Sequence, residues 1–219
     1  MADSLPKVAV VTGGHSYDVT NFHKLFRALE GLEVYIQHMD DFASSPEPVR
    51  DGYDAAVFYI MLREGPKDEG SPWYAGKPKT ALEHLGLVKQ GIVVLHHGLL
   101  AYPQWPIWNE IVGIQDRKFG YHIGQSVRAE VRDPQHPITR GIAPWEMVDE
   151  TYTMADAREG SEVLLTIAHP KSMRTIAWTR QHRNSRVFCF QCGHDNATWP
   201  NPSFREVLRR GILWAAGRI

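Results

Sequence analysis

The sequence predicts one soluble α/β domain built on a mostly parallel β-sheet. In the first half of the chain, short apolar and β-branched segments alternate with segments of helical periodicity, which is typical of βαβ units with right-handed crossovers. Three strand candidates follow late in the sequence, and the turn Asn184-Ser185 joins the last two as a hairpin. These late strands predict an antiparallel part added to the parallel sheet. A chain of 219 residues suits one such doubly wound unit and can bury a sizeable core.

The elements expected in the first half begin with a buried parallel strand. Lys7 to Thr12 (KVAVVT) runs into the turn Gly13-Gly14. Asn21 to Leu29 places four apolar side chains at helical spacing, and Gly31 is a plausible stop. The next elements expected, in chain order, are strands at Glu33 to His38 and Asp54 to Ile60, a loop at Arg63 to Lys79, a helix at Thr80 to Val88 and a central strand at Gly91 to His96.

The second half starts with an irregular, proline-rich and aromatic segment and then returns to regular elements. The elements expected there are a short helix at Trp108 to Val112, an exposed or edge strand at Ser126 to Arg132, strands at Val163 to Ala168, Thr175 to Thr179 and Arg186 to Gln191, and a closing helix at Pro202 to Ala216. The chain shows no repeat, no low-complexity segment and no domain boundary. We therefore expect a single domain over residues 1–219.

The composition excludes several classes of partner. The formal net charge of −1 creates no field that favours nucleic acid or an anionic membrane. The stretch from Met1 to Lys7 lacks the layout of a signal peptide, and no apolar run approaches the length of a membrane span. We expect a cytoplasmic protein with neither a nucleic-acid nor a membrane partner.

The two cysteines, Cys189 and Cys192, form one C-x-x-C unit inside a strand candidate. Residues three apart on a strand face opposite sides, so the spacing argues against a metal-binding or redox pair. Two buried free thiols are the expected state, which suits a reducing compartment.

Three strand ends deliver histidines to one edge of the predicted sheet. His15 follows the first strand, His96 ends the central strand, and His194 follows the strand at Arg186 to Gln191. Ligands of open α/β sheets bind beyond the carboxyl ends of the strands. A histidine at a strand end can also simply donate to a backbone carbonyl, but three on one rim favour a functional site.

An acidic partner for these histidines is expected in Asp149-Glu150-Thr151-Tyr152. This segment precedes a strand-like stretch, so Glu150 and Tyr152 would point to the same side. The alternative is that Asp149 and Glu150 are solvated loop acids. The nearby Asp133 to Pro137, with two prolines, is interpreted as a structural turn.

Two histidines and a glutamate allow two kinds of chemistry. They can bind zinc or another divalent metal with a position left open for water or substrate. They can also act without metal, as general acid and base. No nucleotide cofactor is expected, because Gly13-Gly14 lacks both the G-x-G-x-x-G spacing and the Walker lysine.

Six segments, taken in order, resemble the trehalose-utilisation (ThuA-like) family over nearly the whole chain. They are Gly13-Gly14-His15, Val94-Leu95-His96-His97-Gly98, Asp133 to Gly141, Asp149-Glu150-Thr151-Tyr152, Gly193-His194-Asp195 and Gly211-Ile212-Leu213-Trp214-Ala215. The resemblance implies a three-layer, flavodoxin-like fold of the class I glutamine-amidotransferase type and a link to carbohydrate metabolism.

The resemblance also implies that the polar rim consists of His15, His96, Glu150, Tyr152, His194 and Asp195. The catalytic residues expected are His96, Glu150 and His194. The residues expected to contact substrate are His15, Tyr17, His97, Tyr152, Asp195 and Trp199. A metal, if the family's rim holds one here, would be bound by His15, His96 and His194.

One departure from the wider superfamily limits the chemistry. Glutaminases of this fold carry a nucleophilic cysteine at a Gly-x-Cys-x-Gly elbow, whereas the matching segment here places His96 at that position. Cys189 and Cys192 lie in a different strand and cannot replace it. Amide transfer through a thioester is therefore not expected.

Aromatic residues in the loops refine the expected ligand, a small sugar-like molecule. Tyr17, Tyr102, Trp105 and Trp199 are expected to overhang the rim and stack on a sugar face, with Arg63 and Asn21 as partners for its hydroxyls. The alternative is that Trp105 and Trp108 anchor the proline-rich loop in the core.

The leading hypothesis is an enzyme that acts on a carbohydrate or an oxidised (keto) sugar by hydrolysis, elimination or isomerisation. The alternatives are a non-catalytic sugar-binding domain and a scaffold subunit for a partner such as a sugar dehydrogenase. Pairing of two copies through an exposed sheet edge is a further hypothesis.

Overall fold

The computed structural model describes residues 4–70, 72–158 and 160–219 and contains one nine-stranded sheet with the order β2-β1-β3-β4-β9-β8-β7-β5-β6. The strands are β1 (Lys7–Gly13), β2 (Glu33–His38), β3 (Ala55–Ile60), β4 (Gly91–Leu95), β5 (Gly120–Val131), β6 (Trp145–Thr153), β7 (Glu162–Ile167), β8 (Thr175–His182) and β9 (Ser185–Phe190). The helices are α1 (Val19–Arg27), α2 (Met39–Ser44), α3 (Glu47–Asp51), α4 (Pro78–Glu83), α5 (Pro106–Val112), α6 (Pro202–Ala215) and the 3₁₀ helix η1 (His96–Leu100).

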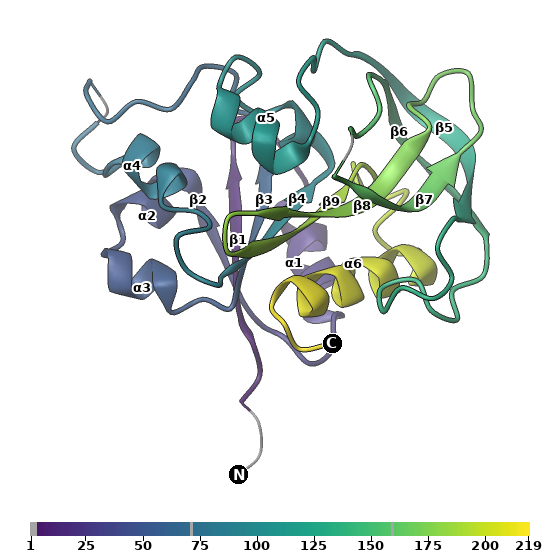
Figure 1. The fold of residues 1–219 in the computed structure, drawn as a ribbon, viewed down its shortest axis with the longest axis horizontal. Helices are drawn as coiled ribbons and strands as arrows, with labels where there is room; N and C mark the ends of the chain where they lie inside the picture. Colours follow the sequence, from purple (N-terminus) through teal and green to yellow (C-terminus); the bar gives the residue numbers. More distant parts are fainter. Residues whose placement is uncertain (1–3, 71, 159) are drawn as a thin grey trace.

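The sheet has a parallel half and an antiparallel half, as expected. β2, β1, β3, β4 and β9 pair in parallel, and β8, β7, β5 and β6 then follow with antiparallel pairing. Figure 1 shows the antiparallel strands at one end of the molecule and α2, α3 and α4 at the other. The parallel strands β3 and β4 are buried along their whole length, which explains their unbroken apolar sequences.

Helices cover both faces of the parallel half, so the fold has three layers. On one face, α1 and α6 pack on alternate residues of the strands, such as Val57 and Phe188. On the other face, α2, α4 and α5 pack on the residues between them, such as Phe58 and Cys189. This alternation confirms the three-layer α/β fold with late antiparallel strands.

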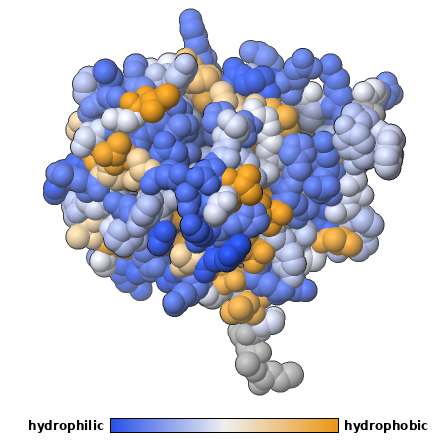
Figure 2. Space-filling view, turned by 180° about the vertical axis from the view of Figure 1, so that it is seen from behind, coloured by the Kyte–Doolittle hydropathy of each residue, from blue (hydrophilic) through white to orange (hydrophobic). Residues whose placement is uncertain are grey.

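The surface seen from behind is mostly hydrophilic and carries several separate hydrophobic areas (Figure 2). Apolar side chains that are at least half exposed among the described residues include Trp73 on the loop before α4 and Tyr121 and Ile123 on β5. Such scattered exposure is ordinary for a protein surface. Pairing of two copies through a sheet edge stays a prediction.

Several expected elements need correction. Two short helices, α2 and α3, were not predicted, because their polar residues give little apolar periodicity. The central strand ends at Leu95, so His96 begins η1. The strand expected at Ser126 to Arg132 begins earlier, at Gly120, and is not at the edge, since β6 lies outside it.

Other expected elements differ in their bounds or lie partly outside the described residues. The helix expected at Thr80 to Val88 begins at Pro78 and ends at Glu83, because Gly86 adopts a left-handed conformation with φ +83°. Residues 1–3 of the N-terminal stretch and residue 71 of the expected loop lie outside the described residues.

The antiparallel half curls back toward the carboxyl ends of the parallel strands. A register shift in β5 between His122 and Gln125, where Gly124 has φ +66°, interrupts the ladder with β6. Such bulges bend a strand and increase its twist. As a result the second half of β6 lies against the loop after β9, and the Gln191 side-chain amide donates to Glu150 O at 2.9 Å. The bending of the antiparallel half therefore brings β6 to the candidate site.

Candidate functional site

His96 occupies a strained elbow between β4 and η1. Its φ of 49° is unusual for a residue with a side chain, and the side chain is completely buried. The left-handed conformation costs about 1 kcal/mol or more and persists only where the surroundings enforce it. Gly98 allows η1 to approach β3 closely, since a Cβ there would lie 2.4 Å from Phe58 O. The strained backbone of His96 therefore lies at the candidate site itself.

The hydrogen bonds of His96 assign its tautomer. Nδ1 lies 2.6 Å from Gln191 O, and a carbonyl oxygen only accepts, so Nδ1 carries the proton. Nε2 is then an acceptor and receives the Tyr152 hydroxyl at 2.7 Å. Burial raises the pKa of Tyr152 well above its usual value, which keeps this hydroxyl protonated. The imidazole thus presents a basic nitrogen to the site.

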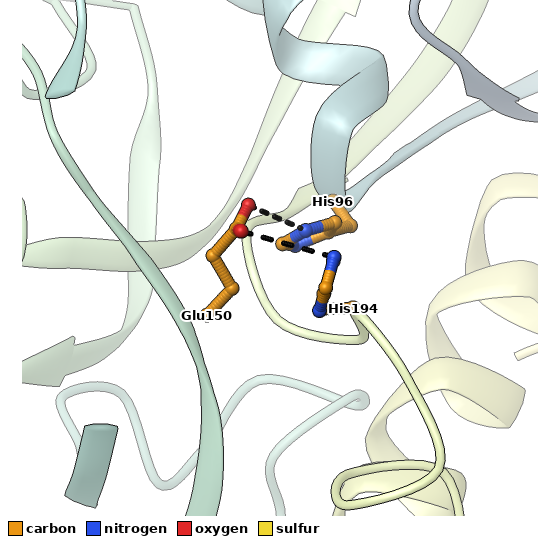
Figure 3. Close-up of side chains that lie close together, drawn as sticks. All are labelled: His96, Glu150 and His194. Carbon is orange, nitrogen blue, oxygen red and sulfur yellow. Dashed lines mark ion pairs between the residues drawn. The ribbon is translucent and has the colours of Figure 1, made fainter. Parts of the chain in front are cut away.

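Glu150 lies between two histidines (Figure 3). Its Oε1 is 3.5 Å from His96 Nε2, and its Oε2 is 3.7 Å from His194 Nε2. Burial raises the pKa of Glu150, but the nearby charge of His194 opposes this effect, and the pKa is lowered overall. The carboxylate is 8% exposed, which excludes the alternative that Glu150 is a solvated loop acid.

Asp149 points to the other side of β6 and anchors the loop that carries His194. Its carboxylate accepts the backbone N–H of Gly193 at 2.7 Å, of His194 at 3.0 Å and of Glu150 at 2.9 Å. Burial raises the pKa of Asp149, and the backbone hydrogen bonds from His194 and Gly193 oppose the rise. A carboxylate that accepts three N–H groups is best satisfied in its ionised form.

The structure also gathers His15 and His97 beside this group. The His97 ring lies 4.6 Å from the His15 ring and 5.5 Å from the His96 ring, measured between centroids. His97 Nε2 is buried without a hydrogen-bond partner, and burial lowers the pKa of His97 well below 6.5, so this histidine is neutral. His15 is half-buried, and its Nδ1 donates to Ser16 O at 2.7 Å.

Two tyrosines expected at the site occupy different places. The Tyr152 hydroxyl faces His96, as described above. Tyr17 is half-buried and packs its ring on Phe22, 4.8 Å away, at the side of the site formed by the β1 turn. A cavity of about 400 Å³ opens there, between Gly14, His15 and Tyr17 on one side and His38 on the other.

Two aromatic residues expected to overhang the rim are buried instead. Trp199 is 2% exposed because its Nε1 donates to Gly193 O at 2.8 Å and its ring packs on Phe22. Tyr102 is also 2% exposed. The expectation that either stacks on a sugar at the rim is therefore wrong. Trp108 is a core anchor, since it is fully buried and donates to Gly98 O, while Trp105 is half-buried.

The polar residues proposed for substrate hydroxyls lie away from the His96–Glu150–His194 group. Asn21 belongs to the first turn of α1 and donates to the carboxylate of its N-cap, Asp18. Arg63 is exposed and donates to Leu100 O at the end of η1. The Asp195 carboxylate accepts Ala197 N at 2.8 Å and lies 3.4 Å from His194 Nδ1 without forming a hydrogen bond.

Three functional neighbours were missed by sequence reasoning. They are Asp149, which holds the His194 loop, Gln191, which fixes the His96 tautomer, and Tyr59, whose hydroxyl donates to His194 O at 2.8 Å. Asp149 stands next to Glu150, and the sequence offers no means to tell which acid faces the histidines. Once this segment is known to form the strand β6, the alternation of side chains along a strand places Asp149 and Glu150 on opposite faces.

The donor set of this group fits a divalent metal. Each of His96, Glu150 and His194 offers one ligand atom, and these atoms all lie within 4.8 Å of one another. Two imidazoles and a carboxylate are a common set for catalytic zinc and for non-haem iron. The hydrogen bond from His96 Nδ1 to Gln191 O is the outer contact that metal-binding histidines usually make. The ring centroids of His15 and His194 are 6.0 Å apart, and Glu150 takes the place that His15 was expected to fill.

Neither thiol belongs to the His96–Glu150–His194 group, although Cys192 contacts the Asp149 carboxylate from the core side. Cys189 and Cys192 are free and buried, on opposite faces of the sheet, as the strand pattern predicts. Burial raises the pKa of both thiols far above neutral. Neither is at the elbow, where a glutaminase would need its nucleophile.

Comparisons with known proteins agree with this fold. The family model ThuA, described as trehalose utilisation, matches residues 9–215. A ThuA-like protein from Parabacteroides merdae is 19% identical with a TM-score of 0.74, covering 98% of this chain and 91% of its own. A ThuA-like protein from Bacteroides uniformis is 17% identical with a TM-score of 0.73, covering 98% and 93%.

A more distant likeness reaches the glutamine-amidotransferase fold. A glutamine amidotransferase from Thermotoga maritima is 9% identical with a TM-score of 0.57, covering 97% of this chain and 98% of its own. No curated protein matches the chain at a significant level. In the described part of the chain, no helix is both long and apolar enough to cross a membrane.

The Asp149 carboxylate generates a prediction about stability. Asp149→Asn places an amide NH₂ among three backbone donors and removes the buried charge that they solvate. We expect the free energy of unfolding to fall by about 2–4 kcal/mol in urea denaturation. Asp195→Asn is the matched control, because this half-exposed carboxylate accepts one backbone N–H, and it should cost about 1 kcal/mol or less. Equal losses in the two variants would contradict the anchoring role of Asp149.

Proposed function

The chain belongs to the ThuA (trehalose utilisation) family, and on this premise we propose that it is an enzyme acting on a carbohydrate or an oxidised (keto) sugar. The reaction class proposed is hydrolysis, elimination or isomerisation. The observation that carries the proposal is the convergence of His96 Nε2, the Glu150 carboxylate and His194 Nε2 at the carboxyl edge of the sheet. In open α/β folds, that edge is where ligands bind.

The chain's own groups suit proton transfer. Glu150, with its lowered pKa, is ionised at neutral pH and can accept a proton. His96 holds a basic Nε2 because its Nδ1 proton is committed to Gln191 O. The Tyr152 hydroxyl, kept protonated by burial, can donate to an oxygen that gains charge. A base and a donor that meet at one point are what elimination or isomerisation next to a carbonyl group requires.

Thioester chemistry does not enter this proposal. His96 occupies the elbow where a glutaminase carries cysteine, and both cysteines are buried in or beside β9. A non-catalytic sugar-binding role is the alternative, and the test below separates it from catalysis. The cytoplasmic location expected from the sequence also remains part of the proposal.

The catalytic role is tested with isosteric variants. Glu150→Gln and His96→Gln remove the proton acceptors while keeping the size of each side chain close to the original. We expect each to lower turnover of trehalose-like disaccharides or their keto derivatives by at least about 100-fold, followed by NMR of the products. Glu146→Gln, an exposed glutamate on the same strand, is the control and should keep wild-type turnover. Wild-type turnover that is unchanged in both glutamine variants would contradict the catalytic role of Glu150 and His96, whereas sugar binding by the wild type without any turnover would support the binding alternative.

A divalent metal is a separate part of the proposal. His96, Glu150 and His194 would hold it, and it would supply Lewis-acid polarisation of a substrate oxygen or an acidified water. We expect untagged protein to contain about one equivalent of a transition metal by elemental analysis, and His194→Gln to lose most of it. Less than about a tenth of an equivalent, with no zinc or manganese uptake measured by titration calorimetry, would contradict this part.

A further inference from the structure

A cavity of about 720 Å³ lies beyond the end of η1, between the loops that carry Arg63, Arg117 and Arg158. Four of its lining residues are cationic, Arg63, Arg117, Lys118 and Arg158, and one is acidic, Asp116. The whole chain has a net charge of −1, so this is a local concentration of positive charge. Clefts lined by charge of one sign concentrate ligands of the opposite sign.

The single acid does not neutralise these cations. The Asp116 carboxylate accepts the backbone N–H of Lys118 at 3.0 Å, which closes a local turn. Within the described ranges, no carboxylate oxygen lies within 4.0 Å of a charged nitrogen of Arg63, Arg117, Lys118 or Arg158. The cavity therefore keeps its positive charge.

Arg117 is a buried cation for which the described residues provide no counter-ion. Its guanidinium donates to Asn109 Oδ1 and to backbone carbonyls of η1 and the residues that follow it, including Leu99 O at 2.8 Å and Tyr102 O at 2.7 Å. All of these acceptors are neutral. Burial, with the charge of Arg63 nearby, lowers the pKa of Arg117 to about 10, so the group is still charged at neutral pH. Buried charges are normally paired, which makes an unpaired one notable.

The cavity borders the candidate active site at Phe119, whose ring lines the cavity and packs against Tyr152. The Arg63 guanidinium lies 5.3 Å from the Phe119 ring centroid, and the Phe119 and Tyr152 centroids are 5.8 Å apart. Tyr152 in turn contacts His96. Arg63 also donates to Leu100 O, at the opposite end of η1 from His96. A 3₁₀ helix of this length rises about 8 Å between those ends, so a ligand of one or two sugar rings would span the distance.

We propose that this cavity is a subsite for an anionic group, a phosphate or a carboxylate, carried by the sugar that reacts at His96 and Glu150. Arg63, Lys118 and Arg158 contact the anion, and Arg117 beneath them adds its field without direct contact, since its donors are already used. The inference rests on the proposed function, because it names a substrate class for the same site. Charge-assisted hydrogen bonds from guanidinium groups are strong and suit both anions.

The test measures binding first. Titration calorimetry compares glucose 6-phosphate, glucuronate and inorganic phosphate with neutral glucose. We expect the wild type to bind at least one anionic sugar about tenfold or more tightly than glucose, with affinity that falls as salt rises. Lys118→Gln/Arg158→Gln, which alters two exposed side chains, should lose at least about tenfold of that affinity. Preference for glucose 6-phosphate or for glucuronate distinguishes the two anions.

A matched control separates the cavity from overall charge. Lys89→Gln/Arg128→Gln removes the same two charges from exposed positions outside the cavity and should bind as the wild type does. Equal affinity for glucose and both anionic sugars, or equal losses in the two double variants, would overturn the subsite.

Failure of the proposed function gives a different pattern. If anion binding depends on Lys118 and Arg158 while Glu150→Gln changes no turnover, the subsite is supported and the catalytic role is not. If a neutral keto sugar is turned over by the wild type and equally by Lys118→Gln/Arg158→Gln, with no anion preference, the catalytic role is supported and the subsite is overturned.

Discussion

The buried carboxylate of Asp149 joins two parts of the sheet that are far apart in strand order. β6 is the outermost antiparallel strand, yet Asp149 receives the N–H groups of Gly193 and His194, which follow the parallel strand β9. The same strand segment places Glu150 and Tyr152 against His96. If the three donors were left without this acceptor, each would carry a desolvation cost of about 1–3 kcal/mol. The geometry of the candidate site therefore depends on a residue that faces away from it.

Backbone strain and imidazole orientation act together at the elbow. The left-handed conformation of His96 turns the chain so that η1 begins at once, and the Gln191 carbonyl then selects the proton position on the ring. Related folds use such an elbow to expose a thiol. Here the same turn presents a basic nitrogen that faces a carboxylate and a phenol, and the thiols are buried in and beside β9.

The sequence predicted the parallel half well because strands such as AAVFYI and GIVVL are buried on both faces and have no polar interruption. It also predicted that the ends of these strands deliver His15, His96 and His194 to one edge, which follows from topology alone. It did not predict β6, because WEMVDETYT alternates charged and apolar residues only in part, and two of its acids, Asp149 and Glu150, lie inward for reasons that depend on tertiary contacts. The burial of Trp199 was not predicted for a similar reason. How far a tryptophan in a loop is buried depends on tertiary contacts, here the hydrogen bond from its indole N–H to the Gly193 carbonyl. The four cations of the cavity come from three separate loops, so no local sequence pattern predicts it.

The most direct test of this account is the protonation state of the His96 ring, measured by long-range ¹H–¹⁵N NMR at neutral pH with His96→Gln to assign the signals. The account predicts a neutral ring protonated at Nδ1, with an unprotonated Nε2 that faces Glu150 and Tyr152. A ring protonated at Nε2 would mean that the Gln191 contact does not fix the tautomer and that His96 has no basic nitrogen at the site. That result would contradict the arrangement on which the proposed chemistry depends.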